Sequence, residues 1–279
     1  MANLGHDLGR GIPPLAFFIE SAIFGAMKFS MVSALLFAGA LGATAAQDAA
    51  ALAEKVAAAY GGAAALEKLV AFREEGTVES TMRPGTSATV RVFARALKLR
   101  VEINRTSQPS ELRVVNEAKG WRDGKEVTGM SYEAMVLQAV RLDLAWQLFA
   151  HKTNLVEAAP LDRHGHHLRV LELTIEDGLK VTAGIDPENG HILFSSGTTK
   201  AAATGATTFE TEYDDFKTVD GLLFAHKETN FAQGTKPADT TLSKVELLKT
   251  APPEAFKPGL ASSAPPERSA DVPGHRQPK

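Results

Sequence analysis

The chain has 279 residues, of which 44% are hydrophobic and 23% charged, a balance typical of a globular protein and unlike that of a disordered one. Its 30 Lys and Arg residues are offset by 33 Asp and Glu residues, which gives a net charge of -3. This excludes the basic surface of a nucleic-acid-binding protein and the polybasic run that holds a protein on anionic membranes. The sequence has no cysteine, so disulfides, thiolate metal sites, a cysteine nucleophile and a lipid-modified N-terminal cysteine are also excluded.

The N-terminal residues have the features of an export signal. Lys28 precedes a short apolar run over residues 29–41, and the small-residue step Ala43-Thr44-Ala45 follows. A charged start, a short apolar core and such a step are the parts of a secretory signal peptide. The run is shorter than the roughly 20 apolar residues of a membrane span. An uncleaved anchor, extended upstream by residues 12–26, is the alternative.

The sequence divides into three parts. Met27 is the expected translation start, so residues 1–46 are interpreted as an upstream extension plus the signal peptide. Residues 47–257 are expected to form a single domain with one substantial hydrophobic core. Residues 258–279 are rich in Pro, Ser and Ala, a composition that predicts disorder. Cleavage would leave the domain in the periplasm without a stable membrane anchor.

The domain begins with an Ala-rich segment that predicts a helix over residues 48–72. Leu52, Val56 and Leu66 recur at helical spacing, and the pair Gly61-Gly62 interrupts the segment once.

Beyond Arg73 the pattern becomes that of strands. Leu99, Val101 and Ile103 alternate with charged residues, as in a sheet with one wet face. Turn residues separate further segments of this kind, at 83–85, 123–124, 177–178, 186–190, 220–221 and 234–237. The expected strands lie around 90–92, 99–103, 112–115 and 121, and near 154–159, 167–175, 179–185, 191–198, 207–216, 222–231 and 240–248.

Two of these segments carry further information. Between Val170 and Leu171 the apolar positions change face, which predicts a bulge or burial on both faces of that strand. Within the strands, residues 131–149 predict one helix with Ser131 as its N-cap. Since residues 142–149 are apolar nearly all round, we expect this helix to be deeply buried and to cover part of the sheet.

These elements predict an α+β fold, with a long antiparallel sheet of ten or eleven strands, an N-terminal helix and an inserted helix. Strand twist makes so long a sheet coil or close, so we expect a curved half-barrel with the helices over its concave face. An aromatic content of 7% is modest for filling it, which leaves room for an apolar guest. The residues expected to line this hydrophobic cavity are Phe93, Val101, Trp121, Met135, Leu144, Trp146, Phe149, Phe194, Phe209 and Phe224.

Two polar clusters have simpler interpretations than catalysis. His164 and His166 lie two apart, near Asp162, but a zinc site needs three or four convergent ligands, so a polar hairpin turn over residues 162–165 is favoured. Glu210 leads a run of acidic residues, and alternation favours a solvated strand face over an acid–base pair. These acidic residues are Glu210, Glu212, Asp214 and Asp215, and His226 and Lys227 on a neighbouring strand are their expected partners.

The sequence has no nucleophile-elbow motif and no phosphate-binding loop motif. We therefore predict no catalytic residue, no metal and no cofactor.

Several stretches resemble a known family. They are Ala59-Tyr60-Gly61-Gly62, Ala65-Leu66-Glu67-Lys68-Leu69, Glu75-Gly76-Thr77-Val78, Val115-Asn116-Glu117-Ala118-Lys119-Gly120-Trp121, Ile185-Asp186-Pro187-Glu188-Asn189-Gly190 and Phe216-Lys217-Thr218-Val219-Asp220-Gly221-Leu222-Leu223-Phe224. With these, residues 48–257 resemble the outer-membrane lipoprotein-sorting proteins, relatives of the carriers LolA and LolB. The resemblance implies a half-barrel whose helices cover a hydrophobic cavity, which in the carriers receives lipoprotein acyl chains. No position matches the carriers' cavity arginine, and the absence of a lipobox cysteine excludes a LolB-like anchored receptor.

The sequence therefore predicts an exported, non-enzymatic carrier for lipid, lipoprotein acyl chains or another hydrophobic ligand, with residues 131–149 as part of its lid. The alternative is an envelope interaction module whose cavity is filled by its own side chains, and whose partner is an exported complex or peptidase. A metal hydrolase using His164, His166 and His167 is the third hypothesis.

Overall fold

The computed structural model describes residues 47–81, 85–106, 108–175, 178–200, 205–259 and 261, all of which belong to one unit of the chain. The predicted signal peptide and most of the predicted C-terminal tail lie outside the described residues. A helix over residues 47–59 is followed by α2, α3, α4 and two short 3-10 turns, η1 and η3. Their bounds are Ala63–Lys68 for α2, Gly129–Leu142 for α3, Leu144–Ala150 for α4, Lys152–Asn154 for η1 and Pro253–Phe256 for η3.

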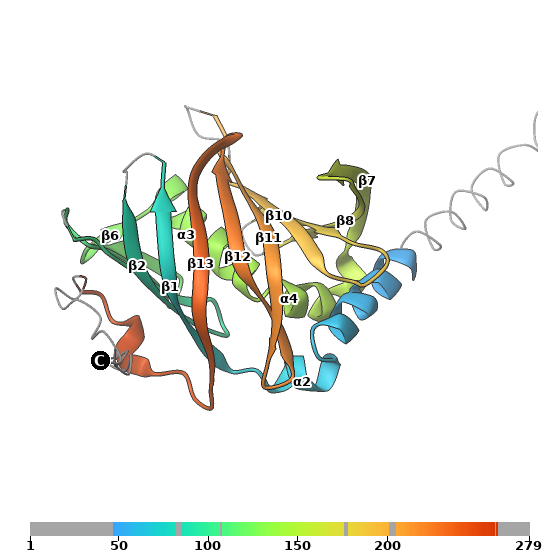
Figure 1. The fold of residues 1–279 in the computed structure, drawn as a ribbon, viewed down its shortest axis with the longest axis horizontal. Helices are drawn as coiled ribbons and strands as arrows, with labels where there is room; N and C mark the ends of the chain where they lie inside the picture. The colour runs from blue at the N-terminus through green and yellow to red at the C-terminus, as the bar shows by residue number, and fades with distance from the viewer. Residues whose placement is uncertain are drawn as a thin grey trace, which may run out of the picture. The chain divides into compact units, whose positions relative to one another are not determined.

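In the described part of the chain, thirteen strands form one antiparallel sheet in the order β6-β5-β4-β3-β2-β1-β13-β12-β11-β10-β9-β8-β7 (Figure 1). The strands are β1 Ala71–Ser80, β2 Thr86–Ala94, β3 Lys98–Asn104, β4 Glu111–Asn116, β5 Lys119–Arg122, β6 Lys125–Val127, β7 Val156–Arg163, β8 His166–Thr174, β9 Lys180–Ile185, β10 Ile192–Thr198, β11 Thr208–Val219, β12 Leu222–Ala232 and β13 Thr235–Leu248.

The sheet curves around α3. This helix contacts both β4 and β10, although six strands lie between these two in the sheet order. In a flat sheet they would be about 34 Å apart at about 4.8 Å per strand, whereas a helix with its side chains is only about 10–12 Å wide. One helix therefore reaches both strands only because the sheet bends, which confirms the predicted half-barrel with helices over one face.

The main hydrophobic core lies between this curved face and the helices. Leu52 and Val56 of the first helix are buried in it, as their spacing predicts, together with Leu137 of α3. In β8, Leu171 and Leu173 join the main core while Leu168 and Val170 are buried on the opposite face. Of the two predicted explanations for the change of face, burial on both faces of β8 is therefore correct. The register shift of this pair of strands lies in β7, between Ala158 and Leu161.

A second, smaller core covers the other face of the sheet near the C-terminus. Alternation in β2 sends Phe93 into the main core and its neighbours Val92 and Ala94 into the second core. Phe256 of η3 closes this second core and is 1% exposed. The fully or mostly buried members are Ala71, Val92, Ala94, Leu112, Val114 and Phe256.

Two-residue turns join many of the strands as predicted. At Asp123-Gly124 and Asp220-Gly221 both residues have positive φ, which is the backbone of the hairpin turns whose twist matches the strands. His164-Gly165 forms another such turn between β7 and β8, which confirms the hairpin interpretation of the histidine cluster. At Gln233-Gly234 the turn ends earlier than predicted, because Pro237 lies within β13. Of the other predicted turns, parts of 83–85 and 177–178 lie outside the described residues.

Four predictions about the elements were wrong. Two strands, β1 and β6, were not predicted, and Phe72 belongs to β1 and not to the first helix. The inserted helix is two helices, separated at Asp143, which is buried and faces Arg95. Its N-cap residue is Thr128, without a side-chain capping hydrogen bond, and not Ser131.

Candidate functional site

Two hollows lie between the helices and the curved face of the sheet. The outer hollow has a volume of about 540 Å³ and lies between α3 and strands of both halves of the sheet, β1–β5 and β11–β13. The inner hollow has a volume of about 80 Å³ and lies between Tyr60, the junction of α3 with α4, and β12. The outer hollow has the size of a small-molecule site, about 300–1,000 Å³.

Six of the ten predicted cavity residues line these hollows. Val101 of β3, Met135 of α3 and Phe209 of β11 face the outer hollow. Leu144, Trp146 and Phe224 face the inner hollow.

The other four predicted cavity residues lie elsewhere. Phe93 fills the main core against Phe72, with ring centres 5.2 Å apart. Trp121 packs against the second core on the opposite face of the sheet. Phe149 stacks between Trp146 and Lys152, and the guanidinium of Arg163 covers Phe194 at 4.5 Å from its ring centre. Phe93 lies on the curved face of the sheet but outside the hollow, whereas Trp121 lies on the opposite face.

The outer hollow is not purely apolar, in contrast to the prediction. Five arginines and three glutamates line it, interleaved with apolar side chains such as Val101, Ile103 and Met135. The arginines are Arg91, Arg105, Arg113, Arg122 and Arg141, and the glutamates are Glu111, Glu210 and Glu228.

One arginine lies between two carboxylates in the Arg91 cluster, which consists of Arg91, Glu74 and Glu228. The two terminal nitrogens of Arg91 each donate to an oxygen of Glu228 at 2.7 Å, and its Nε lies 2.7 Å from Oε2 of Glu74. All three side chains are at most 8% exposed. Burial, opposed by Arg91 and assisted by Glu228, raises the pKa of Glu74 to about 7. A single guanidinium thus neutralises Glu228, and Glu74 holds its proton to near-neutral pH.

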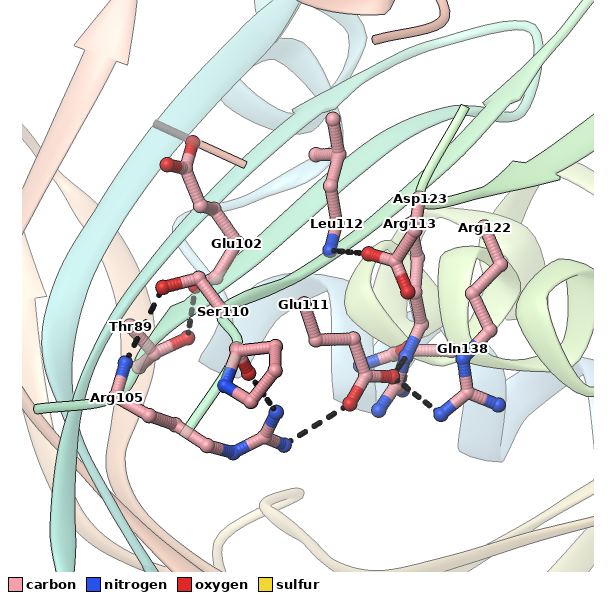
Figure 2. A network of polar contacts seen from close by, with 11 residues as sticks. Thr89, Glu102, Arg105, Ser110, Glu111, Leu112, Arg113, Arg122, Asp123 and Gln138 are labelled. Atoms are coloured by element: carbon pink, nitrogen blue, oxygen red, sulfur yellow. Dashed lines mark hydrogen bonds and ion pairs between the residues drawn. The ribbon is translucent and has the colours of Figure 1, made fainter. Parts of the chain in front are cut away.

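One carboxylate lies among three arginines in the Glu111 cluster, which consists of Glu111, Arg105, Arg113 and Arg122 (Figure 2). Arg113 and Arg122 approach Oε1 of Glu111 at 2.7 Å, and Arg105 approaches Oε2 at 3.0 Å. Burial alone would raise the pKa of Glu111, but the charges and hydrogen bonds of the arginines outweigh it and lower the pKa to about 2. Glu111 is therefore ionised at neutral pH, and the cluster carries two more positive charges than negative ones.

Arg141 of α3 lines both hollows. Its guanidinium donates to the Leu137 and Phe209 carbonyls and, at 3.0 Å, to Oγ1 of Thr211. Among the described residues it forms no ion pair within 4.0 Å, and burial lowers its pKa. A cation held by neutral oxygens therefore marks the boundary between the two hollows.

The sequence did not single out any member of the Arg91 and Glu111 clusters. Their residues come from β1, β2, β4, β5, β12 and the residue that follows β3. Strand pairing brings them together, so the sequence alone does not show that they are neighbours. The available signal was a charged residue, Glu74 or Arg91, inside a strand on the parity of its apolar neighbours.

The predicted polar clusters have structural roles. His167 pairs with Asp162 at 2.7 Å and His164 with Glu212 at 3.1 Å. No group of three or more potential metal ligands occurs in the part of the chain that the structure describes.

The acidic strand is less solvated than predicted. Glu210 and Glu212 are half-buried and pair with Arg163 of β7, at 3.3 and 2.6 Å. His226 does not pair with the acidic residues, because it is buried and its Nδ1 lies 3.1 Å from the Leu242 carbonyl oxygen. Register does place Lys227 opposite Asp214.

Comparison with known proteins gives matches to solved structures alone: no family model and no curated protein matches the chain. The chain is similar to an outer membrane lipoprotein-sorting protein domain from Vibrio parahaemolyticus, with 12% identity and a TM-score of 0.46 over 76% of this chain and 97% of that one. It is also similar to a DUF1329 family protein from Desulfovibrio piger, with 10% identity and a TM-score of 0.48 over 73% and 93% of the two chains. A LolA superfamily protein from Nitrosomonas europaea gives 12% identity and a TM-score of 0.43 over 76% and 97%.

Two of these descriptions name the family that the sequence motifs resemble. With identities of 10–12% and TM-scores below 0.5, the likeness extends to no individual residue.

Proposed function

We propose that this chain is an exported binding protein that carries an amphiphilic molecule, with the apolar part of that molecule in the outer hollow. The single observation that supports this most is the outer hollow itself, about 540 Å³ of space under α3 with apolar side chains on both sides. Each methylene group that leaves water for such a surface contributes about 0.8 kcal/mol, so a hydrocarbon tail gains affinity without specific contacts.

The seating of α3 supports a persistent hollow. A Cβ atom at Gly197 of β10 would lie 2.9 Å from Leu137, and one at Gly120 of β5 would lie 2.8 Å from Tyr132. The helix thus rests closely on β5 and β10, on both sides of the hollow, and spans the space between them. We infer that a ligand enters between the hairpin ends near Ser87 and Ala232, which line the outer hollow.

Export is the second part of the proposal. The signal-like residues 27–45 lie outside the described residues, so the sequence pattern alone supports secretion into the periplasm. Among the helices of the described ranges, none is long and apolar enough to span a membrane.

The test is displacement of a neutral fluorescent probe, N-phenylnaphthylamine, from the purified protein by oleoyl lipids. Ala134 of α3 lines the outer hollow, and Ala134→Trp should fill it and weaken lipid binding by at least about tenfold, equivalent to about 1.4 kcal/mol. Ala150→Trp places the same side chain at an exposed position of α4 and should leave binding unchanged.

Two results would oppose the proposal. If the unmodified protein neither binds the probe nor yields acyl species on solvent extraction, the carrier function is wrong. A stoichiometric protein partner recovered without lipid would then favour the envelope interaction module.

A further inference from the structure

The Glu111 cluster has an arrangement of charge that sheet pairing alone does not favour. Arg113 of β4 and Arg122 of β5 are direct cross-strand partners, and like charges in this position destabilise a sheet. One carboxylate, Glu111, neutralises one of the three guanidinium groups, and the two remaining positive charges face the outer hollow. A second anion would balance them.

The three guanidinium groups also have unused hydrogen-bonding capacity. Together they carry fifteen N–H donors, and the described residues accept five hydrogen bonds from them: three by Glu111, one by the Pro109 carbonyl and one by Gln138. Guanidinium groups bind carboxylate and phosphate oxygens in pairs, with charge-assisted hydrogen bonds.

The Glu111 cluster lies directly beside the apolar side chains of the outer hollow. In the register of β3 with β4, Val101 lies opposite Arg113 and Ile103 opposite Glu111, and all four side chains line the outer hollow. Solvent reaches the cluster, because the Arg122 side chain is 50% exposed. An oxyanion bound here would therefore be continuous with a tail that lies against Val101 and Met135.

We propose that the Glu111 cluster binds the anionic headgroup, phosphate or carboxylate, of the amphiphile whose tail occupies the outer hollow. This proposal rests on the proposed carrier function and narrows its ligand to acidic amphiphiles. Arg105, Arg113 and Arg122 bind the oxyanion, and Glu111, which pairs with all three arginines, competes with the ligand for their charge and hydrogen bonds.

The experiment compares headgroups on one tail. Oleoyl lysophosphatidate and oleate carry an anion, monoolein carries none, and inorganic phosphate is an anion without a tail. Each competes for bound N-phenylnaphthylamine in the unmodified protein and in three variants. Arg122→Gln removes one guanidinium, and Glu111→Gln removes the competing carboxylate. Arg73→Gln is the control, because Arg73 is 41% exposed and, among the described residues, forms its ion pair within 4.0 Å with Glu75.

We expect Arg122→Gln to weaken binding of oleoyl lysophosphatidate and oleate about tenfold, the effect of one lost charge-assisted hydrogen bond, and to leave monoolein unchanged. Glu111→Gln should strengthen binding of both anionic lipids, since it leaves all three guanidinium groups for the ligand. A role confined to folding does not predict opposite effects from these two variants. Arg73→Gln should match the unmodified protein.

Other outcomes would overturn the inference. Equal binding of monoolein and the anionic lipids in all variants would disprove the headgroup site and leave the carrier function standing. Phosphate binding as tight as that of oleoyl lysophosphatidate would identify a free-phosphate site instead. If no lipid displaces the probe from the unmodified protein, the carrier function itself is wrong.

Discussion

The Arg91 cluster and the Glu111 cluster use the same two residue types in opposite proportions. In the first, one arginine lies between two glutamates and every side chain is buried. In the second, one glutamate lies among three arginines, whose side chains are 15% to 50% exposed. Charges in a dry site must nearly cancel, because an unpaired buried ion is unstable, whereas solvent tolerates an excess at the edge of the hollow. The comparison shows that the partly exposed Glu111 cluster, unlike the buried Arg91 cluster, can carry an excess of positive charge, which is the feature that the proposed headgroup site requires.

The largest expected effect on stability comes from removing the arginine of the buried Arg91 cluster. Arg91→Met leaves Glu74 and Glu228 buried without their counterion, and should lower the free energy of unfolding by about 3–5 kcal/mol. Urea denaturation followed by circular dichroism measures it, with Arg73→Met as the control at an exposed ion pair. A loss below about 1 kcal/mol would show that Arg91 is dispensable for stability.

A smaller effect follows from the pKa of Glu74, about 7 in the folded protein against an ordinary value of 4.5. Between these values the folded state binds more protons than the unfolded state, so the free energy of unfolding should fall as pH rises from about 5 to 7.5. We expect a decrease on the order of 1–3 kcal/mol.

The variant Glu74→Gln isolates this contribution. In this variant the free energy of unfolding should fall less as pH rises, and at pH 8 the variant should be more stable than the unmodified protein. Asp143, whose pKa burial also raises to about 7 against the opposing effect of Arg95, contributes in the same pH window, so Asp143→Asn measures the other share. Identical pH profiles for Glu74→Gln and the unmodified protein would contradict the assignment.

The smallest effect on stability is expected at the edge of the hollow. Arg122 is half-exposed, and Glu111 keeps Arg105 and Arg113 when it is removed, so Arg122→Gln should change the free energy of unfolding by no more than about 0.5 kcal/mol. The same urea titration measures it. If Arg122→Gln is as unstable as Arg91→Met, the exposed Glu111 cluster is as important for stability as the buried Arg91 cluster, and the contrast between them is wrong.

The pattern of neighbouring residues in the sequence was sufficient to predict most of the fold. Alternation in β3 and the Asp220-Gly221 turn each depend on residues adjacent in the chain, so a single sequence predicts them. The prediction of strands failed where a charged residue is buried. Glu74 makes β1 look exposed on both faces, and its partner Arg91 is recognised only through the register of β1 with β2. Asp143 interrupts the inserted helix for the same reason, since Arg95 lies on a distant segment.

The candidate site was predicted less well than the fold. The sequence predicted a cavity under the inserted helix, and Val101, Met135 and Phe209 of the predicted set line the outer hollow. It did not predict the polar lining, because an arginine in a strand ordinarily indicates a wet face. The three arginines around Glu111 converge only after β3, β4 and β5 are paired.

The pairing of β1 with β13 also governs the order in which the protein folds. Every other pair of neighbours in the sheet is consecutive in the chain, so β1–β6 and β7–β13 are two local meanders joined at one seam. Closing that seam brings Ala71 beside Leu248 and must overcome the entropy of a very long loop. The hollow, which has walls from both meanders, therefore comes into existence only once the last strand has left the ribosome.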